Sequence, residues 1–125
     1  MKEKRPVNLD LTGMRFPVTA ITSILHRITG LVLFLALPFM IWMLQMSVSG
    51  EAEYYNLINV LREPLLRFVS WALAVAAGYH VIAGLRHILM DVGLIKPTVR
   101  GGALSSWVVL GLAVAFAVFA GVKLW

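Results

Sequence analysis

The sequence predicts an all-α membrane protein with three transmembrane helices. Of the 125 residues, 60% are hydrophobic and the mean hydropathy is +0.86, which is more apolar surface than a soluble domain of this size can bury. The apolar residues form continuous blocks, and the longest cover residues 28–44, 68–85 and 101–122. Each block is close to the roughly 18–20 residues that a helix needs to cross the hydrocarbon core.

The ends of the first helix and of the connection after it are marked by proline, serine and glycine. The first span is expected over about 17–46, because Pro17 suits the first turn of a helix and Ser49 with Gly50 ends it. The polar stretch 51–63 is expected to form a short surface helix.

The second and third helices have their own boundary residues. The second span is expected over about 64–93, opened by Pro64 and stopped by Pro97. The third is expected over about 104–124, with Trp107 and Trp125 as interfacial anchors. The chain then divides into an N-terminal segment (1–16) and a three-helix anchor domain (17–125).

The distribution of charge orients the spans, since loops rich in Lys and Arg stay in the cytoplasm. Four basic residues precede the first span, and two lie in the second connection: Lys2, Lys4, Arg5, Arg15, Lys96 and Arg100. The first connection instead holds three glutamates. We therefore expect a multi-pass protein of the bacterial inner membrane, with residues 1–16 in the cytoplasm and the C-terminus in the periplasm.

Several classes of function are excluded by composition. The chain has no cysteine, so it cannot form disulfides, ligate an iron–sulfur cluster through thiolates or attach haem covalently. It contains no glycine-rich nucleotide-binding motif. The net charge of +5 comes from basic residues that flank apolar spans, not from an exposed basic stripe, so no nucleic-acid partner is expected.

Two polar clusters lie at the ends of apolar helices, where ionisable residues are costly and usually mark a ligand, a cofactor or an ion path. One begins the first span and the other ends the second span; their members are Ser23, His26 and Arg27, and His80, Arg86, His87 and Asp91. Because consecutive spans are antiparallel, both clusters should meet at the cytoplasmic interface.

His80 is the residue expected to lie inside the bilayer, roughly 9 Å deeper than Arg86 at 1.5 Å per residue. A neutral imidazole in lipid suits an axial ligand of haem iron, and the haem propionates would seek the cationic side chains of His26, Arg27 and Arg86. Nearby small residues would leave room for the macrocycle: Ala76, Ala77, Gly78, Ala83 and Gly84. The alternatives are that these residues permit close helix packing around a hydrogen-bonded His80, or that His80 serves a proton relay.

A six-coordinate haem would need a second ligand from outside the chain. His87 follows His80 by seven residues on the same helical face, so the two approach an iron from the same side. His26 is expected too close to the interface to match His80 in depth. A second membrane subunit is the simpler source. Asp91 is placed to orient His87 by a hydrogen bond, or else the two form a surface pair.

Ser23 and Arg27 are four residues apart and share one helical face. A hydroxyl and a guanidinium at the lipid boundary suit a quinone carbonyl, whose negative charge grows on reduction. The alternative is a polar helix start with an arginine that snorkels to the headgroups.

Three segments carry a resemblance to a known family. R-P-V-N-L-D-L (5–11), S-I-L-H-R-I-T-G (23–30) and H-V-I-A-G-L-R-H-I-L-M-D-V-G (80–93) resemble the cytochrome b membrane-anchor subunit of succinate dehydrogenase, respiratory complex II. The resemblance covers nearly the whole chain.

The resemblance implies a set of roles. His80 would be the axial ligand of haem b, with the second ligand from a histidine of a second small anchor. Ser23 and Arg27 would bind ubiquinone, and His26 and Arg27 would lie near the propionates, with His87 on that side.

The resemblance also implies a heteromeric helical bundle within a larger complex. A flavoprotein subunit with FAD would oxidise succinate to fumarate, and an iron–sulfur subunit would pass the electrons to quinone, both docked on the cytoplasmic face. The chain alone would have no dicarboxylate-oxidising site and no catalytic residue. An anchor of a fumarate reductase, a structural anchor without a redox role and a transporter subunit remain as alternatives, the last without any repeat or broken helix to support it.

Overall fold

The computed structural model describes residues 16–125 and contains, within them, four helices and no strand. The helices are α1 (Val18–Val48), α2 (Glu51–Leu61), α3 (Pro64–Asp91) and α4 (Val99–Leu124). Three of them, α1, α3 and α4, are long and apolar enough to cross a membrane. The predicted fold class is therefore confirmed, whereas the segment predicted for residues 1–16 lies almost wholly outside the described residues.

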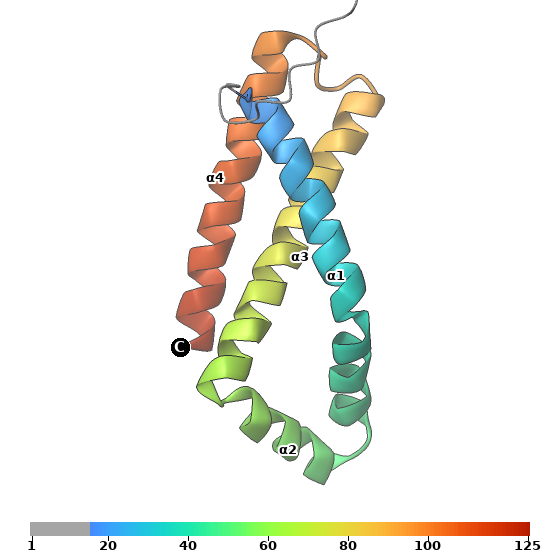
Figure 1. The fold of residues 1–125 in the computed structure, drawn as a ribbon, viewed down its shortest axis with the longest axis vertical. Coiled ribbons are helices and arrows are strands. Elements are labelled where there is room, and N and C mark those ends of the chain that lie inside the picture. The colour runs from blue at the N-terminus through green and yellow to red at the C-terminus, as the bar shows by residue number, and fades with distance from the viewer. Residues whose placement is uncertain (1–15) are drawn as a thin grey trace, which may run out of the picture.

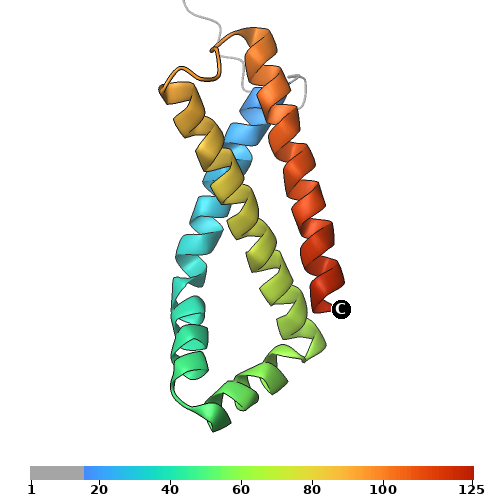
Figure 2. The same cartoon turned by 180° about the vertical axis from the view of Figure 1, so that it is seen from behind.

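Helix α1 crosses α3 and meets the start of α4 in one half of the molecule, here called the convergent end, and α2 lies at the opposite end (Figure 1). Helix α3 packs against both α1 and α4, and α2 joins α1 to α3 across the open end (Figure 2). The expected short helix between the first two spans is therefore present. Its buried residue is Leu57, so α2 presents one apolar position to the bundle.

Helix α1 continues through Pro38, which cannot donate the backbone hydrogen bond of a regular helix. The helix changes direction in its second half and diverges there from α3 (Figure 1), as expected for a proline-induced bend. The first half of α1 is consequently the part that packs in the bundle.

Helix α4 begins at Val99, five residues before the predicted start at 104. Thr98 caps it, because its Oγ1 accepts a hydrogen bond of 3.0 Å from the Gly101 backbone N–H. A side chain at Gly101 would place its Cβ 2.7 Å from the Lys96 carbonyl oxygen. The glycine thus allows the connection to fold tightly onto the start of α4, which sequence periodicity alone does not reveal.

Side-chain hydrogen bonds and small residues join the long helices. Tyr79 Oη donates to the Thr22 carbonyl (2.8 Å), which links α3 to α1, and Trp71 Nε1 donates to the Ala117 carbonyl (2.9 Å), which links α3 to α4. Most large apolar side chains remain exposed. This is the pattern of a membrane bundle, where close packing and hydrogen bonds replace the hydrophobic effect between helices.

Candidate histidine and quinone site

Three histidines from α1 and α3 form one cluster at the convergent end. The rings of His26 and His80 stack with centroids 4.1 Å apart and planes 17° apart, and the ring of His87 lies 5.1 Å from that of His26 at 51°. The expectation that His26 lies too near the interface to match His80 in depth is wrong. His26 is eight residues into α1, about 12 Å along its axis, so it reaches the level of His80.

The orientation of the His80 ring is set by α1. Its Nδ1 lies 3.1 Å from the His26 carbonyl oxygen and 3.2 Å from Thr29 Oγ1. The Thr29 hydroxyl is 2.9 Å from the Leu25 carbonyl, to which it donates. Because a carbonyl oxygen only accepts, Nδ1 carries the proton and the neutral ring keeps a lone pair on Nε2. That lone pair is what a metal ion would require.

Gly30 provides the space for this ring. A Cβ at Gly30 would lie 3.0 Å from His80 Cε1 and 3.6 Å from Nδ1, closer than an ordinary contact of about 3.5–4.0 Å between carbons. Beside it, His26 Nε2 is buried and has no hydrogen-bond partner. A buried imidazole nitrogen without a partner is costly, so this position suits a polar group from outside the chain.

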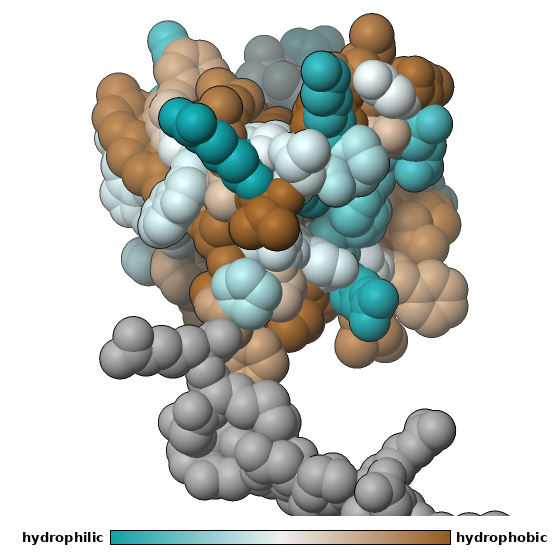
Figure 3. All heavy atoms as spheres, turned by 90° about the horizontal axis from the view of Figure 1, so that it is seen from above, coloured by the Kyte–Doolittle hydropathy of each residue, from teal (hydrophilic) through white to brown (hydrophobic). Residues whose placement is uncertain are grey.

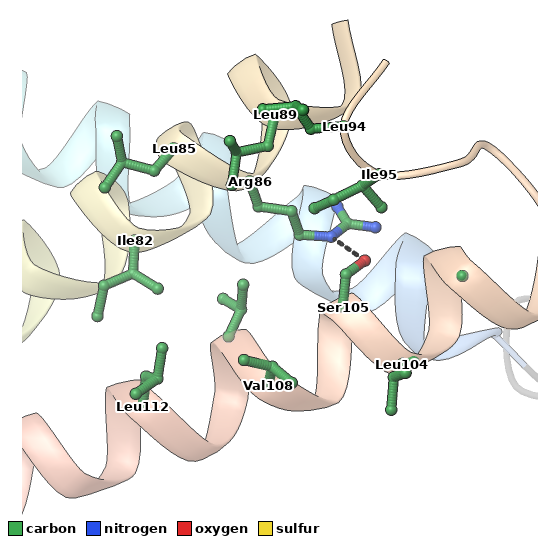
Figure 4. Close-up of a pocket in the computed structure, with 12 residues that line it drawn as sticks. Ile82, Leu85, Arg86, Leu89, Leu94, Ile95, Leu104, Ser105, Val108 and Leu112 are labelled. Atoms are coloured by element: carbon green, nitrogen blue, oxygen red, sulfur yellow. Dashed lines mark hydrogen bonds between the residues drawn. The ribbon is translucent and has the colours of Figure 1, made fainter. Parts of the chain in front are cut away.

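Arg86 is buried, with 5% of its surface exposed, and is directed toward α4. Its Nε donates to Ser105 Oγ at 2.9 Å (Figure 4) and its Nη2 donates to the Gly102 carbonyl at 3.3 Å. The guanidinium therefore fastens two helices as well as supplying positive charge. Sequence reasoning anticipated the charge and missed the partner Ser105.

A polar cavity of about 380 Å³ opens beside the cluster, where α1, α3 and the start of α4 meet. Its lining includes Thr19, Ser23, Arg86, His87 and Gly102. Seen from this end, hydrophilic side chains gather over the converging helices (Figure 3). The structure thus brings Ser23 together with Arg86 and His87.

Two of the expected site residues lie apart from this cavity. Arg27 is exposed on α1 and does not line it. Asp91 is exposed at the end of α3, and no hydrogen bond joins it to His87. The ring of His87 instead lies next to that of His26. Neither expectation for His87, a hydrogen bond from Asp91 or a surface pair with it, included this contact.

The small residues around His80 are used mainly for packing. A Cβ at Gly78 would lie 2.5 Å from the ring of Phe116 on α4, and one at Gly84 would lie 3.6 Å from His26 Nε2. Ala83 is fully buried. These contacts favour the packing alternative for these three positions. Thr29, which contacts His80, was not among the predicted residues, although it lies in the same motif, three residues after His26.

Comparison with known proteins identifies the family of this chain. Residues 1–120 match the model of the family described as succinate dehydrogenase/fumarate reductase transmembrane subunit. The chain belongs to this family. Its sequence is 39% identical to the succinate dehydrogenase cytochrome b556 subunit of Coxiella burnetii over the full length of both chains. It is 34% identical to the cytochrome b560 subunit of Reclinomonas americana, over 96% of this chain and 86% of the relative.

A third relative is the succinate dehydrogenase cytochrome b556 subunit of Paracoccus denitrificans, with 35% identity over 71% of this chain and 68% of the relative. The prediction of a succinate dehydrogenase cytochrome b anchor is confirmed by these matches. The chain is accordingly a multi-pass membrane subunit of a respiratory electron-transport enzyme.

Proposed function

We propose that this subunit binds haem b together with a second small membrane anchor, and that it forms part of the ubiquinone-reduction site of a succinate:quinone oxidoreductase. In this proposal His80 is the axial ligand from this chain. The observation that carries it is the bond from His80 Nδ1 to the His26 carbonyl. Ligating histidines usually donate their other ring N–H to such a carbonyl, which fixes the tautomer and the ring orientation.

The residues around His80 fit haem. Gly30 leaves space against the ring, and the buried His26 Nε2 lacks a partner that a propionate carboxylate would provide. We assign His26, Arg27, Arg86 and His87 to the propionate side. Of the five N–H donors of Arg86, two are used by α4, which leaves others for an anion. Haem bound here would hold one electron close to the quinone.

The second axial ligand is proposed to come from the partner anchor. Within this chain the ring of His26 stacks on that of His80 at 4.1 Å, and the ring of His87 lies 5.1 Å from that of His26. A histidine of the second anchor would complete the haem site without moving His26 out of this stack.

Ser23 and Arg27 are proposed to bind ubiquinone at the boundary with the iron–sulfur subunit. Ser23 is half-buried in the polar cavity, where its hydroxyl can donate to a quinone carbonyl. Arg27 is exposed one turn further along α1, so its guanidinium can reach a ligand shared with a partner. Reduction adds two electrons and two protons to the quinone, and a nearby cation stabilises the negative charge that develops on its oxygen.

The remaining parts of the reaction are assigned to partner subunits. A flavoprotein subunit with FAD would oxidise succinate to fumarate, and an iron–sulfur subunit would deliver the electrons. The loop charges favour placing the N-terminus and the α3–α4 connection in the cytoplasm of a bacterial cell, with the C-terminus in the periplasm. The site at the convergent end would then face both partners.

The haem assignment is tested by His80→Ala in the assembled complex. The b-type absorbance should be lost or strongly perturbed, while succinate oxidation by a soluble dye reports that the partners are still docked. His87→Ala is the matched control, because this ring lies near the cluster without being assigned to the iron; it should shift the spectrum without abolishing it. An unchanged spectrum in His80→Ala would refute the assignment and leave a structural anchor.

The quinone assignment is tested by Arg27→Leu. Quinone reduction should fall, whereas dye-linked succinate oxidation should persist. Arg62→Leu is the control, since Arg62 is also exposed but follows α2 at the opposite end of the bundle. Equal loss of both activities in Arg27→Leu, or equal quinone reduction in the two variants, would count against the assignment.

A further inference from the structure

We propose that the outer groove between α3 and α4 binds an anionic phospholipid, with an acyl chain in the groove and the phosphate at Lys96 and Arg100. The groove is lined by none of the three clustered histidines, although Arg86 lines both the groove and the polar cavity. The proposal does not depend on the haem or quinone assignments.

The groove has a volume of about 550 Å³ and an aliphatic lining (Figure 4). Two helices supply most of it: Ile82, Leu85 and Leu89 on α3, and Leu104, Val108 and Leu112 on α4. From Leu104 to Leu112 is eight residues, about 12 Å along the membrane-spanning direction at 1.5 Å per residue. A largely apolar groove lined along two helices is suited to an extended hydrocarbon chain.

Two polar side chains, Arg86 and Ser105, line the groove. Arg86 Nε is bonded to Ser105 Oγ at 2.9 Å (Figure 4), and Ser105 Oγ donates to the Gly102 carbonyl at 3.0 Å. These bonds satisfy Ser105 Oγ and one donor of Arg86, and a second Arg86 donor bonds the Gly102 carbonyl. A hydrocarbon chain in the groove can cover these bonded atoms without breaking a hydrogen bond.

The end of the groove is closed by Ile95 and Gly101, and the basic residues Lys96 and Arg100 are next to them in the chain. Both basic side chains are exposed. Gly101 keeps the connection close to the start of α4, because the lack of a side chain lets the Lys96 carbonyl approach it. Residues 92–101, at this end of the groove, thus include two basic residues and no acidic one.

The size of the groove favours a lipid chain over a helix of a partner. At the roughly 30 Å³ that a water-sized group occupies, 550 Å³ corresponds to about 18 such groups, which is the scale of one acyl chain. A helix with its side chains is about 10 Å across, so only part of one could enter a space of this volume. The cytoplasmic leaflet, where loop charge places this end, is also the leaflet rich in anionic lipid.

The test uses the purified complex containing this chain, with native mass spectrometry after adding phosphatidylglycerol or phosphatidylcholine. The complex should bind one phosphatidylglycerol about 30-fold more tightly than phosphatidylcholine, at about 5-fold for each of the two basic residues. Val108→Trp should fill the groove and weaken both lipids at least about 10-fold. Val118→Trp is the matched control, because Val118 is similarly exposed on α4 (62% against 53%) but lies outside the groove.

The rim is tested by the double change Lys96→Gln and Arg100→Gln, which alters exposed residues and keeps the groove. It should remove the preference for phosphatidylglycerol and leave phosphatidylcholine binding unchanged. The proposal is overturned if Val108→Trp binds lipid like Val118→Trp, if the preference survives the rim change, or if Val108→Trp releases a protein partner without affecting lipid. Should Val108→Trp fail to assemble, the rim variant decides the question alone.

Discussion

Gly30→Ala is the substitution that tests the histidine cluster most directly. The new Cβ would lie 3.0 Å from His80 Cε1, whereas carbon atoms in ordinary contact are about 3.5–4.0 Å apart. The ring must therefore move by about 0.5–1 Å. Such a movement stretches the 3.1 Å separation between His80 Nδ1 and the His26 carbonyl beyond hydrogen-bond range.

The expected cost combines overpacking with a lost hydrogen bond. Overpacking costs about 1–3 kcal/mol and the hydrogen bond about 1 kcal/mol, while alanine returns up to about 1 kcal/mol through its higher helix propensity. We expect a net loss of about 1–3 kcal/mol. The purified complex should show less haem per flavin and lose its haem absorbance at a lower temperature than the unmodified complex.

Two other glycines provide controls. Gly111→Ala adds a methyl group where nothing lies within 4 Å, so it should leave haem content unchanged and raise the thermal midpoint slightly through its higher helix propensity. Gly78→Ala meets the Phe116 ring at 2.5 Å, so it should destabilise the α3–α4 contact without touching His80. If Gly30→Ala matches Gly111→Ala in both measurements, the argument that His80 depends on this space is refuted.

Three further changes probe the bonds between helices, each measured as the thermal midpoint of the purified complex. Tyr79→Phe removes the donor to Thr22 and should cost about 1 kcal/mol; an unchanged midpoint would show that the contact carries no stability. Ser105→Ala should cost more, about 1–3 kcal/mol, because it leaves a buried donor of Arg86 unpaired, and a smaller effect than that of Tyr79→Phe would contradict this reasoning. Trp71→Phe keeps an aromatic ring but removes its donor to α4, so it should lower the midpoint by a similar amount to Tyr79→Phe, and a higher midpoint would count against the bond.

The helices were predictable because a long apolar block can adopt only one regular structure, the helix, when it crosses lipid by itself. Backbone groups must be satisfied within each segment, so each block becomes a helix. The start of α4 was misplaced because it depends on a local cap, Thr98, and on the close approach at Gly101. A hydropathy pattern reveals neither the cap nor the close approach.

The membership of the candidate site was predictable only in part, and its geometry less so. Antiparallel spans bring Ser23 and His87 to one end, as expected, and both line the same cavity. The stacking of His26 on His80 was not foreseen, because the relative depth of residues on two helices depends on how the helices shift against each other. Counting residues from each interface carries no information on that shift. Arg86 was foreseen as a cation, but its bond to Ser105 needs the register of α4.

The scarcity of buried apolar side chains has a consequence for how the subunit persists in a cell. Among residues 16–125, only Leu57, Tyr79, Ala83 and Val109 form a buried hydrophobic interior, and surrounding lipid tails reward helix association no more than separation. Chains synthesised in excess of their neighbours should then loosen readily and become targets for membrane proteases. Abundance of the subunit would follow the supply of its companions rather than its own rate of synthesis.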